Sequence, residues 1–251
     1  MEIRLTEHGD HIAIITIDNQ PRRNAMTRDM IGDLANLWDR LETSHHRCII
    51  LTGAGDRAFS SGADLGGDLS ASPELARAIN RGLLKTHPYR KPIVAAVNGD
   101  CVAGGLELLL STDIRAASPN ARFGLPEVKW SIYPFGGSTS KLAQQIGYVH
   151  AMDLLLTAEL ISAETATERG LVNQVVPADQ LMDWAIAKAE TIAANSPSAV
   201  QAVKWQMSST VADHAISRET MDQELGDDVR GGPHFDEGVA AFLEKRQPRY
   251  E

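Results

Sequence analysis

A chain of 251 residues that is 43% hydrophobic and 23% charged has the composition of a globular protein with a substantial core. Its formal net charge is −9 without a block of like charges, so it lacks the basic face that nucleic acid or an anionic membrane surface requires. The N-terminus shows no signal peptide, and no apolar run approaches the roughly 20 residues of a membrane span. We therefore expect a cytoplasmic protein that binds neither nucleic acid nor membrane.

The N-terminal region predicts a strand followed by an amphipathic helix. Apolar and polar residues alternate over 11–18, which is typical of a strand, and Pro21 ends it. Residues 27–42 carry apolar side chains at helical spacing, with Thr27 as the expected N-cap. The residues expected on the buried face of this helix are Met30, Leu34, Leu37 and Leu41.

Two short apolar runs predict strands that are buried on both faces. Residues 47–53 and 91–99 each end at a glycine, and a helix is expected over 72–87 between them. Alternating strands and helices of this kind favour an α/β fold. Cys48 and Cys101 lie in apolar surroundings without metal-ligand spacing, so we expect them to be buried free thiols.

The pattern changes near the end of the chain, where the strand signals stop. Helical spacing is found over 177–196, 197–210 and 234–246. Prolines stand where the first helical turns are expected, at Pro177, Pro197 and Pro233. We therefore divide the chain into an α/β core over 1–190 and a helical oligomerisation region over 191–251.

Gly53, Gly55 and Ala58 have the spacing of a dinucleotide-binding fingerprint. Such a site requires a helix to begin directly after the glycines, so that the helix N-terminus meets the pyrophosphate. Here the sequence continues as FSSGADLGG without helical periodicity. This argues against a dinucleotide site and favours a loop whose main chain is closely approached by another group.

Two loops rich in small residues, 60–64 and 98–107, each follow a predicted strand. Small side chains leave main-chain N–H groups accessible, and a helix with free amides at its N-terminus is expected to begin near Gly104. Each loop alone is typical of an ordinary tight turn. The two together indicate a site for an oxygen anion.

Glu107 is surrounded by leucines in the sequence AGGLELLLS. A solvated carboxylate or an ion pair with an arginine is the alternative interpretation, but the leucines disfavour a solvent-facing position. Glu127 follows Pro126 in a second stretch rich in glycine and aromatic residues. Because burial raises a carboxyl pKa, two such groups beside an anion site suit a general acid and a general base.

Several motifs occur in the order and spacing of one enzyme family. They are AFSSGADL, IVAAVNGDCVAGGLELLLSTDIRAAS, RFGLPEVKW and YPFGGS, followed by AMDLLLTAELISAETATERGLVNQVVP and EGVAAFLEKRQPRY. On these motifs the chain resembles the crotonase, or enoyl-CoA hydratase/isomerase, superfamily over nearly its whole length. The resemblance implies an α/β fold, a crotonase-like spiral of ββα repeats with a C-terminal helical trimerisation region.

The resemblance also implies roles for particular residues. The main-chain N–H groups of Ala63 and Gly104 would bind the thioester oxygen of an acyl-CoA and stabilise the enolate. Glu107 and Glu127 would activate a water that adds to the β-carbon of a 2-enoyl thioester, and Glu127 would exchange the proton at the α-carbon. The presence of both glutamates favours an enoyl-CoA hydratase that forms 3-hydroxyacyl-CoA in fatty-acid or related metabolism. The alternatives are an enoyl-CoA isomerase or another enolate-stabilising enzyme of this fold, and a non-catalytic acyl-CoA-binding protein.

Coenzyme A enters as part of the acyl-CoA substrate, and the resemblance implies no metal or redox cofactor. Candidate substrate or CoA contacts fall in two loops and in the C-terminal tail: Arg22, Arg23, Ala25, Ser61, Asp64, Leu65, Phe242 and Lys245. Arginine suits phosphate through its bidentate geometry, and two solvated side chains are the alternative for the arginines. The tail positions would reach CoA in a neighbouring subunit of a homotrimer, or of a hexamer built from two trimers.

The loop YPFGGS departs from the family pattern because it is one glycine shorter than the P-G-x-G-G of many hydratases. Phe135 or Gly136 is therefore expected where a main-chain amide would contact the water or Glu127. Trp130 and Tyr133 are expected either to narrow the acyl pocket or to belong to the core.

Overall fold

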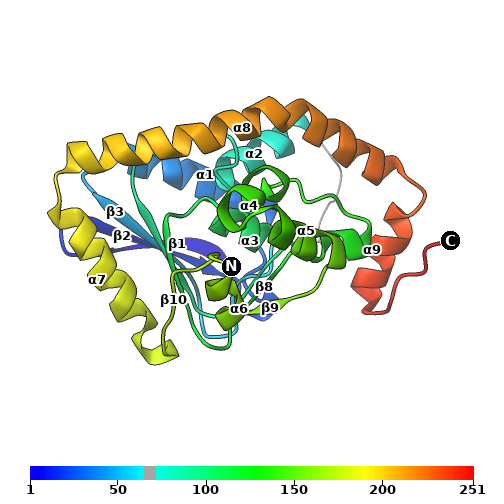
Figure 1. The fold of residues 1–251 in the computed structure, drawn as a ribbon, viewed down its shortest axis with the longest axis horizontal. Coiled ribbons are helices and arrows are strands. Elements are labelled where there is room, and N and C mark those ends of the chain that lie inside the picture. The colour runs from blue at the N-terminus through cyan, green and yellow to red at the C-terminus, as the bar shows by residue number, and fades with distance from the viewer. Residues whose placement is uncertain (65–71) are drawn as a thin grey trace.

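The computed structural model describes residues 1–64 and 72–251, and the larger of its two sheets has six strands (Figure 1). The strand order is β1-β2-β3-β5-β7-β10. The bounds of these strands are β1 (Glu2–His8), β2 (Ile12–Asp18), β3 (Cys48–Gly53), β5 (Ile93–Val97), β7 (Ile114–Ala117) and β10 (Gln174–Val175). β1 pairs antiparallel with β2, and all other neighbours are parallel, so the carboxyl ends of β2, β3, β5 and β7 share one edge.

The smaller sheet has four short strands in the order β4-β6-β8-β9. They are β4 (Ala58–Ser60), β6 (Asp100–Val102), β8 (Arg122–Gly124) and β9 (Ile161–Ser162). The chain alternates between the sheets, since β3 is followed by β4 and then a helix, and β5 by β6 and then a helix. This repeated strand–strand–helix turn confirms the spiral fold that the motifs implied.

The helices cover the sheets and form the end of the chain. They are α1 (Arg28–Glu42), α2 (Pro73–Gly82), α3 (Gly104–Leu109), α4 (Ser138–Ile146), α5 (Tyr148–Thr157), α6 (Ala163–Glu168), α7 (Leu181–Ala194), α8 (Pro197–Gly231) and α9 (Phe235–Glu244). Short 3₁₀ helices in the described ranges are η1 (Gln20–Arg22), η2 (Pro126–Trp130) and η3 (Ala178–Gln180). Thr27 caps α1 as predicted, because its hydroxyl accepts a hydrogen bond from the N–H of Met30 at 3.2 Å.

The central strands β3 and β5 of the larger sheet are buried on both faces, as their continuous apolar runs predicted. In β3, Ile49 and Leu51 point into the main core together with the apolar face of α1. Cys48 and Ile50 point to the opposite face, where Leu181, Ala185 and Ala189 of α7 cover them. Both cysteines are free and buried, as expected. The predicted division at residue 190 would fall inside α7, and it stays a prediction.

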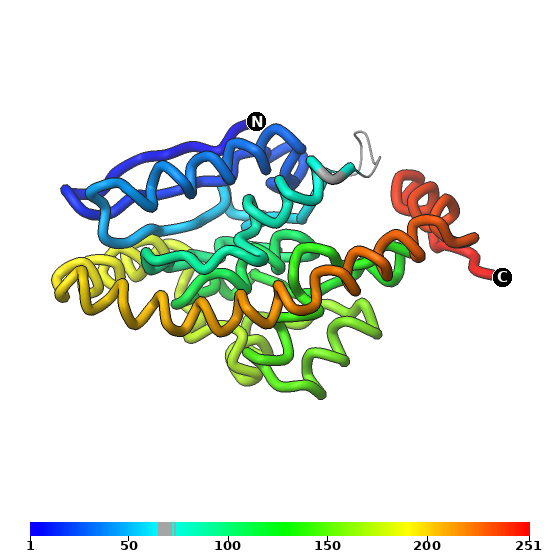
Figure 2. The backbone as a smooth tube through the Cα atoms, turned by 90° about the horizontal axis from the view of Figure 1, so that it is seen from above, coloured from blue at the N-terminus to red at the C-terminus, as the bar shows by residue number. Residues whose placement is uncertain are grey.

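The last third of the chain is helical, as predicted, and α8 alone spans 35 residues. Figure 2 shows α8 running along the core and leading to α9 at one end of the molecule. There α9 packs against η2, with the rings of Phe242 and Trp130 5.3 Å apart. Within the described ranges, no helix combines the length and the apolar character needed to cross a bilayer.

Candidate active site

The two loops predicted to offer main-chain amides lie side by side. They follow β4 and β6, which are neighbouring parallel strands of the smaller sheet. Gly62 has a φ of +91°, and a Cβ at this position would lie 2.8 Å from the nitrogen of Gly104. A Cβ on Gly104 would in turn lie 3.6 Å from the nitrogen of Ala63. Only glycine at position 62 allows this approach, and it brings the two predicted amides together.

Both amides are free to bind an oxygen atom. Gly104 is the first residue of α3, so its N–H has no intrahelical acceptor. In the part of the chain that the structure describes, no main-chain carbonyl accepts a hydrogen bond from Ala63 or Gly104. Ala103 precedes Gly104 with φ 53° and ψ −133°, a conformation that is strained for a residue with a Cβ. The strain is held by the surrounding fold at the point where the second amide is presented.

Glu107 lies in α3 with 4% of its surface exposed, which confirms its burial. Its Oε1 accepts hydrogen bonds from the main-chain N–H of Ser138 at 3.1 Å and from the Ser138 hydroxyl at 2.9 Å. Burial raises the pKa of Glu107, whereas Ser138, the Gly136 amide and the charge of Lys85 oppose that rise. The environment of Glu107 therefore supports its ionised form better than burial alone would.

Glu127 lies in η2 and is 8% exposed. Burial, together with the negative charge of Glu107, raises the pKa of Glu127 well above its ordinary range. Its Oε2 is buried and has no hydrogen-bond partner among the described residues. The two carboxyls therefore differ in chemistry, because Glu107 has donors for a negative charge, whereas burial and the charge of Glu107 favour the protonated form of Glu127.

The YPFGGS loop lies against the first glutamate, since a Cβ on Gly136 would lie 2.3 Å from Oε2 of Glu107. The expected contact of this loop with the water or Glu127 stays a prediction. Ser138, which follows the two glycines, supplies the donors to Glu107. The shortened loop therefore holds the first glutamate. Ser138 was missed from the sequence, and the only available signal was a hydroxyl residue at the start of a helix after Gly-Gly.

The predicted CoA residues of the first loop lie beside the loop that follows β4. Met26 donates from its N–H to the carbonyl of Gly62 at 2.8 Å, and the N–H of Asp64 donates to the carbonyl of Met26 at 2.9 Å. The Ser61 hydroxyl donates to the carbonyl of Arg22 at 3.1 Å. Ala25 is buried in the same segment. Ala25, Ser61 and Asp64 therefore belong to one paired structure next to the Ala63 amide.

The two predicted arginines have different surroundings. Arg22 is exposed, whereas Nη1 of Arg23 lies 2.8 Å from Oδ2 of Asp100, a carboxylate that Arg122 also binds. Arg23 is therefore already paired in this structure, although its side chain is 48% exposed. Leu65 lies outside the described residues.

Phe242 and Lys245 lie at the end of α9, and Phe242 packs on Trp130 of its own chain. Lys245 ends the helix in a left-handed conformation with φ 56°. A Cβ on Gly238 would lie 2.0 Å from the carbonyl oxygen of Trp130, so α9 approaches η2 closely. Trp130 therefore packs against the C-terminal helix, and a role in narrowing the acyl pocket stays a prediction.

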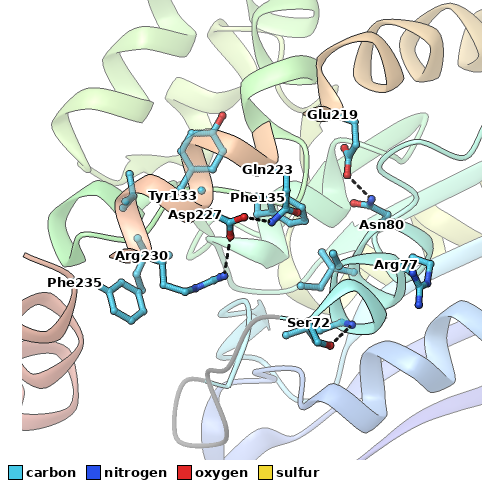
Figure 3. Close-up of a pocket in the computed structure, with 16 residues that line it drawn as sticks. Ser72, Arg77, Asn80, Tyr133, Phe135, Glu219, Gln223, Asp227, Arg230 and Phe235 are labelled. Carbon is cyan, nitrogen blue, oxygen red and sulfur yellow. Dashed lines mark hydrogen bonds and ion pairs between the residues drawn. The ribbon is translucent and has the colours of Figure 1, made fainter. Parts of the chain in front are cut away.

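A cavity of about 580 Å³ lies between α2 and α8, next to the YPFGGS loop (Figure 3). Apolar and aromatic residues line much of it: Leu75, Ala76, Ile79, Ile132, Tyr133, Phe135, Val229 and Phe235. Its polar side chains bond to one another, as in the pairs Asn80–Glu219 at 2.7 Å and Gln223–Asp227 at 2.9 Å. Phe135 lines this cavity, and Gly136, which follows it in the chain, contacts Glu107. The cavity therefore lies next to the glutamates.

Among the described residues, one group of side chains has the composition of a metal site. Glu7, His45 and His46 place one ligand atom each within 4.8 Å of one another. His46 precedes β3, so this group lies at the opposite edge of the sheet from the glutamates. Nε2 of His46 already bonds Glu7 at 3.0 Å. The group takes no part in the site that contains Glu107.

The spiral of strand–strand–helix turns is the crotonase fold, and it presents a pair of buried carboxyls near two free amides. Residues 7–251 match the family model described as enoyl-CoA hydratase/isomerase. The chain belongs to this family, which confirms the resemblance seen in its motifs.

Known relatives cover almost the whole chain. It is 39% identical to enoyl-CoA hydratase EchA19 of Mycobacterium tuberculosis, with 98% of this chain and 96% of the relative aligned. It is 36% identical to (E)-benzylidenesuccinyl-CoA hydratase of Thauera aromatica, with 97% of each chain aligned. Among solved structures, an enoyl-CoA hydratase/isomerase from Pseudoalteromonas atlantica T6c superposes with a TM-score of 0.90 at 27% identity, covering 100% of both chains.

Proposed function

We propose that this enzyme adds water across the double bond of a 2-enoyl-CoA thioester to form the 3-hydroxyacyl-CoA. The observation that carries the proposal is the pairing of two unlike buried carboxyls: Oε1 of Glu107 accepts two hydrogen bonds, whereas Oε2 of Glu127 has no partner among the described residues. Hydration requires one group that takes a proton from water and one that gives a proton to carbon. Relatives named as hydratases, 39% and 36% identical, support this reaction.

The residues have separate roles in the proposed reaction. Glu107 is the base: it takes one proton from water as the water oxygen bonds to the β-carbon. The π electrons of the double bond move toward the thioester carbonyl, and the N–H groups of Ala63 and Gly104 bind the resulting enolate oxygen. Glu127, which retains a proton because its pKa is raised, then protonates the α-carbon. The product gains the OH of the water at its β-carbon and the proton of Glu127 at its α-carbon, and the water proton left on Glu107 returns to Glu127, directly or by exchange with solvent, which restores the starting state.

The cavity beside Phe135 is the proposed acyl pocket. Its volume of about 580 Å³ exceeds what a short acyl chain fills, so a long or ring-bearing acyl group fits it better. Aromatic side chains at Tyr133, Phe135 and Phe235 offer flat apolar contacts to such a group. The relative named for benzylidenesuccinyl-CoA acts on an acyl group of this bulky kind.

The remaining parts of the proposal concern binding and assembly. Coenzyme A is part of the substrate, with Arg22 and Arg23 as phosphate contacts and Phe242 and Lys245 as contacts from a neighbouring subunit. We also propose a homotrimer or a hexamer of two trimers, and a cytoplasmic location. Apolar side chains exposed on α8 and α9 are available for such an interface: Val203, Met207, Ile216, Met221, Leu225 and Leu243.

The test is a spectroscopic assay of the purified protein with crotonyl-CoA and with longer 2-enoyl-CoA thioesters. Hydration removes the conjugated enone absorbance, and Glu107→Gln should slow it about 100- to 10,000-fold, because a positioned base contributes about that much. If a 3-enoyl-CoA is isomerised at an undiminished rate by Glu107→Gln, the enzyme is an isomerase. If calorimetry shows CoA binding without turnover of any thioester, the protein is an acyl-CoA-binding protein.

A further inference from the structure

We propose that Asp222 of α8 is a positioning residue, which holds both ends of the segment that binds Glu107. The proposal depends on the function proposed above, because it concerns the orientation of the catalytic base. Asp222 lies far from the glutamates in the sequence and belongs to the C-terminal helical region. It is nevertheless 4% exposed.

The geometry joins one carboxylate oxygen to two flanking hydroxyls. Oδ1 of Asp222 accepts a hydrogen bond from the Tyr133 hydroxyl at 2.7 Å and from the Thr139 hydroxyl at 3.3 Å. Residues 133 and 139 are the two ends of the segment that carries Gly136 and Ser138. The carboxylate therefore ties the two ends of this segment to α8, while its middle contacts Glu107.

The other oxygen of Asp222 holds a buried cation. Nζ of Lys85 lies 3.2 Å from Oδ2 of Asp222 and 2.8 Å from Oε2 of Glu219. The same ammonium lies 4.1 Å from the centre of the Phe135 ring, in the middle of the segment. Lys85 is completely buried, as Asp222 nearly is, so water screens this pair much less than a pair at the surface. The segment is thus held at both ends by hydroxyls and at its centre by a cation.

The Tyr133 hydroxyl that bonds Asp222 stays protonated at the pH at which the enzyme would work. Burial, together with the bond to Asp222, raises the pKa of Tyr133 to about 12. Tyr133 therefore donates to the carboxylate throughout the range in which the enzyme would act. This contact persists as long as α8 stays docked on the core.

Small movements of the segment would matter for the reaction. Gly136 leaves no room for displacement, because a Cβ there would already overlap Oε2 of Glu107. Ser138 supplies two donors to Oε1 of Glu107, and both lie inside the segment that Asp222 holds. A shift of about 1 Å in a catalytic group can cost about a hundredfold in rate. Losing the contacts to Asp222 should therefore lower kcat more than it changes KM.

The experiment uses a variant that removes both hydroxyls and keeps the Asp222–Lys85 pair, Tyr133→Phe combined with Thr139→Val. The matched control is Tyr89→Phe, which removes a buried hydroxyl that bonds the carbonyl of Trp38 in α1 at 3.0 Å and makes no bond to the segment 133–139. We expect kcat of the double variant to fall about tenfold or more with KM within about twofold, and kcat of the control to stay unchanged. Thermal unfolding of each variant verifies that the assays are made on folded protein.

A double-mutant comparison separates positioning from general stability. If Asp222 acts through Ser138, adding Ser138→Ala to the double variant should lower kcat further by less than about threefold, far less than it does alone. Full additivity, or an unchanged kcat in the folded double variant, would overturn the proposal. The role of Asp222 alone is refuted if full additivity or an unchanged kcat is found for an enzyme whose wild type hydrates the thioester and whose Glu107→Gln variant is inactive. Absence of turnover in the wild type would instead refute the proposed function.

Discussion

The carboxylate of Glu107 accepts hydrogen bonds from both the main-chain N–H and the hydroxyl of Ser138, at 3.1 and 2.9 Å. Ser138 begins α4, so one residue couples the start of that helix to a carboxylate buried in α3. These donors stabilise negative charge on Glu107, while Oε2 of the neighbouring Glu127 has no donor among the residues that the structure describes. The proposed division between base and acid rests on this difference.

Ser138→Ala should lower activity near neutral pH about tenfold, because a hydrogen bond to a charged group contributes about 1.5–3 kcal/mol. The Ser138 hydroxyl opposes the rise in the pKa of Glu107, so its removal moves that pKa further upward. A base must be ionised to act, hence the acidic limb of the kcat–pH profile should move to higher pH. The check is a kcat–pH profile of both proteins. A profile with an unmoved acidic limb would contradict the role of Ser138.

Glu127→Gln should abolish most activity and change how stability depends on pH. The pKa of Glu127 is raised in the folded protein, whereas in the unfolded chain it is ordinary, about 4.3. Above that pH the unfolded chain binds fewer protons than the folded one, so this group makes the free energy of unfolding fall as pH rises. The variant has no carboxyl at position 127, so its free energy of unfolding lacks this decrease with pH. Its free energy of unfolding relative to wild type should therefore increase from about pH 5 to pH 8, measured by urea denaturation.

Gly62→Ala should separate the two amides that the proposal places around the enolate oxygen. The new Cβ would lie 2.8 Å from the nitrogen of Gly104, and φ at this residue is +91°. We expect kcat/KM to fall about 100- to 1,000-fold, as for loss of one donor to such an oxygen. Gly32→Ala is the matched control, since its Cβ would meet nothing within 4 Å. It lies in α1 and should leave activity intact and stabilise the fold by up to about 1 kcal/mol.

Gly226 lies in α8 on the wall of the cavity between α2 and α8. A Cβ there would make ordinary contacts, 3.6 Å from Tyr133 and 3.8 Å from Phe135. Gly226→Ala should therefore keep activity, whereas Gly226→Leu should extend into the cavity. We expect Gly226→Leu to reduce kcat/KM for long 2-enoyl-CoA substrates by about tenfold or more and for crotonyl-CoA by less than about threefold. Equal losses for both substrates would show that the cavity does not hold the acyl group.

Arg22 is exposed beside the loop that carries the Ala63 amide. If it binds a phosphate of CoA, Arg22→Ala should raise KM for an enoyl-CoA about tenfold, as expected for a lost charge-assisted hydrogen bond. The same variant should leave KM unchanged for the corresponding pantetheine thioester, which lacks the nucleotide. A similar KM increase for both substrates would place Arg22 away from the phosphates.

Some features of the site could be predicted because their signals are local. Four leucines around Glu107 indicated a buried carboxylate, and small residues at Gly62 and Gly104 indicated exposed amides. Thr27 was recognised as a helix cap from its position before an apolar stripe. Each of these features depends on residues a few positions apart in the sequence, so residue spacing and side-chain size are enough to predict it.

The sequence by itself thus determined the alternation of strands and helices, the burial of Glu107 and the family to which the chain belongs. Only the tertiary structure decided that Ser138 binds Glu107, that Asp222 of α8 holds the segment around Ser138, and that Trp130 packs on Phe242. The pairs are separated by 31, 84 and 112 positions, and nothing in the spacing of either partner specifies the other. Such contacts form only when the spiral brings remote segments together, because hydrogen bonds and ring packing depend on separation in space and not along the chain.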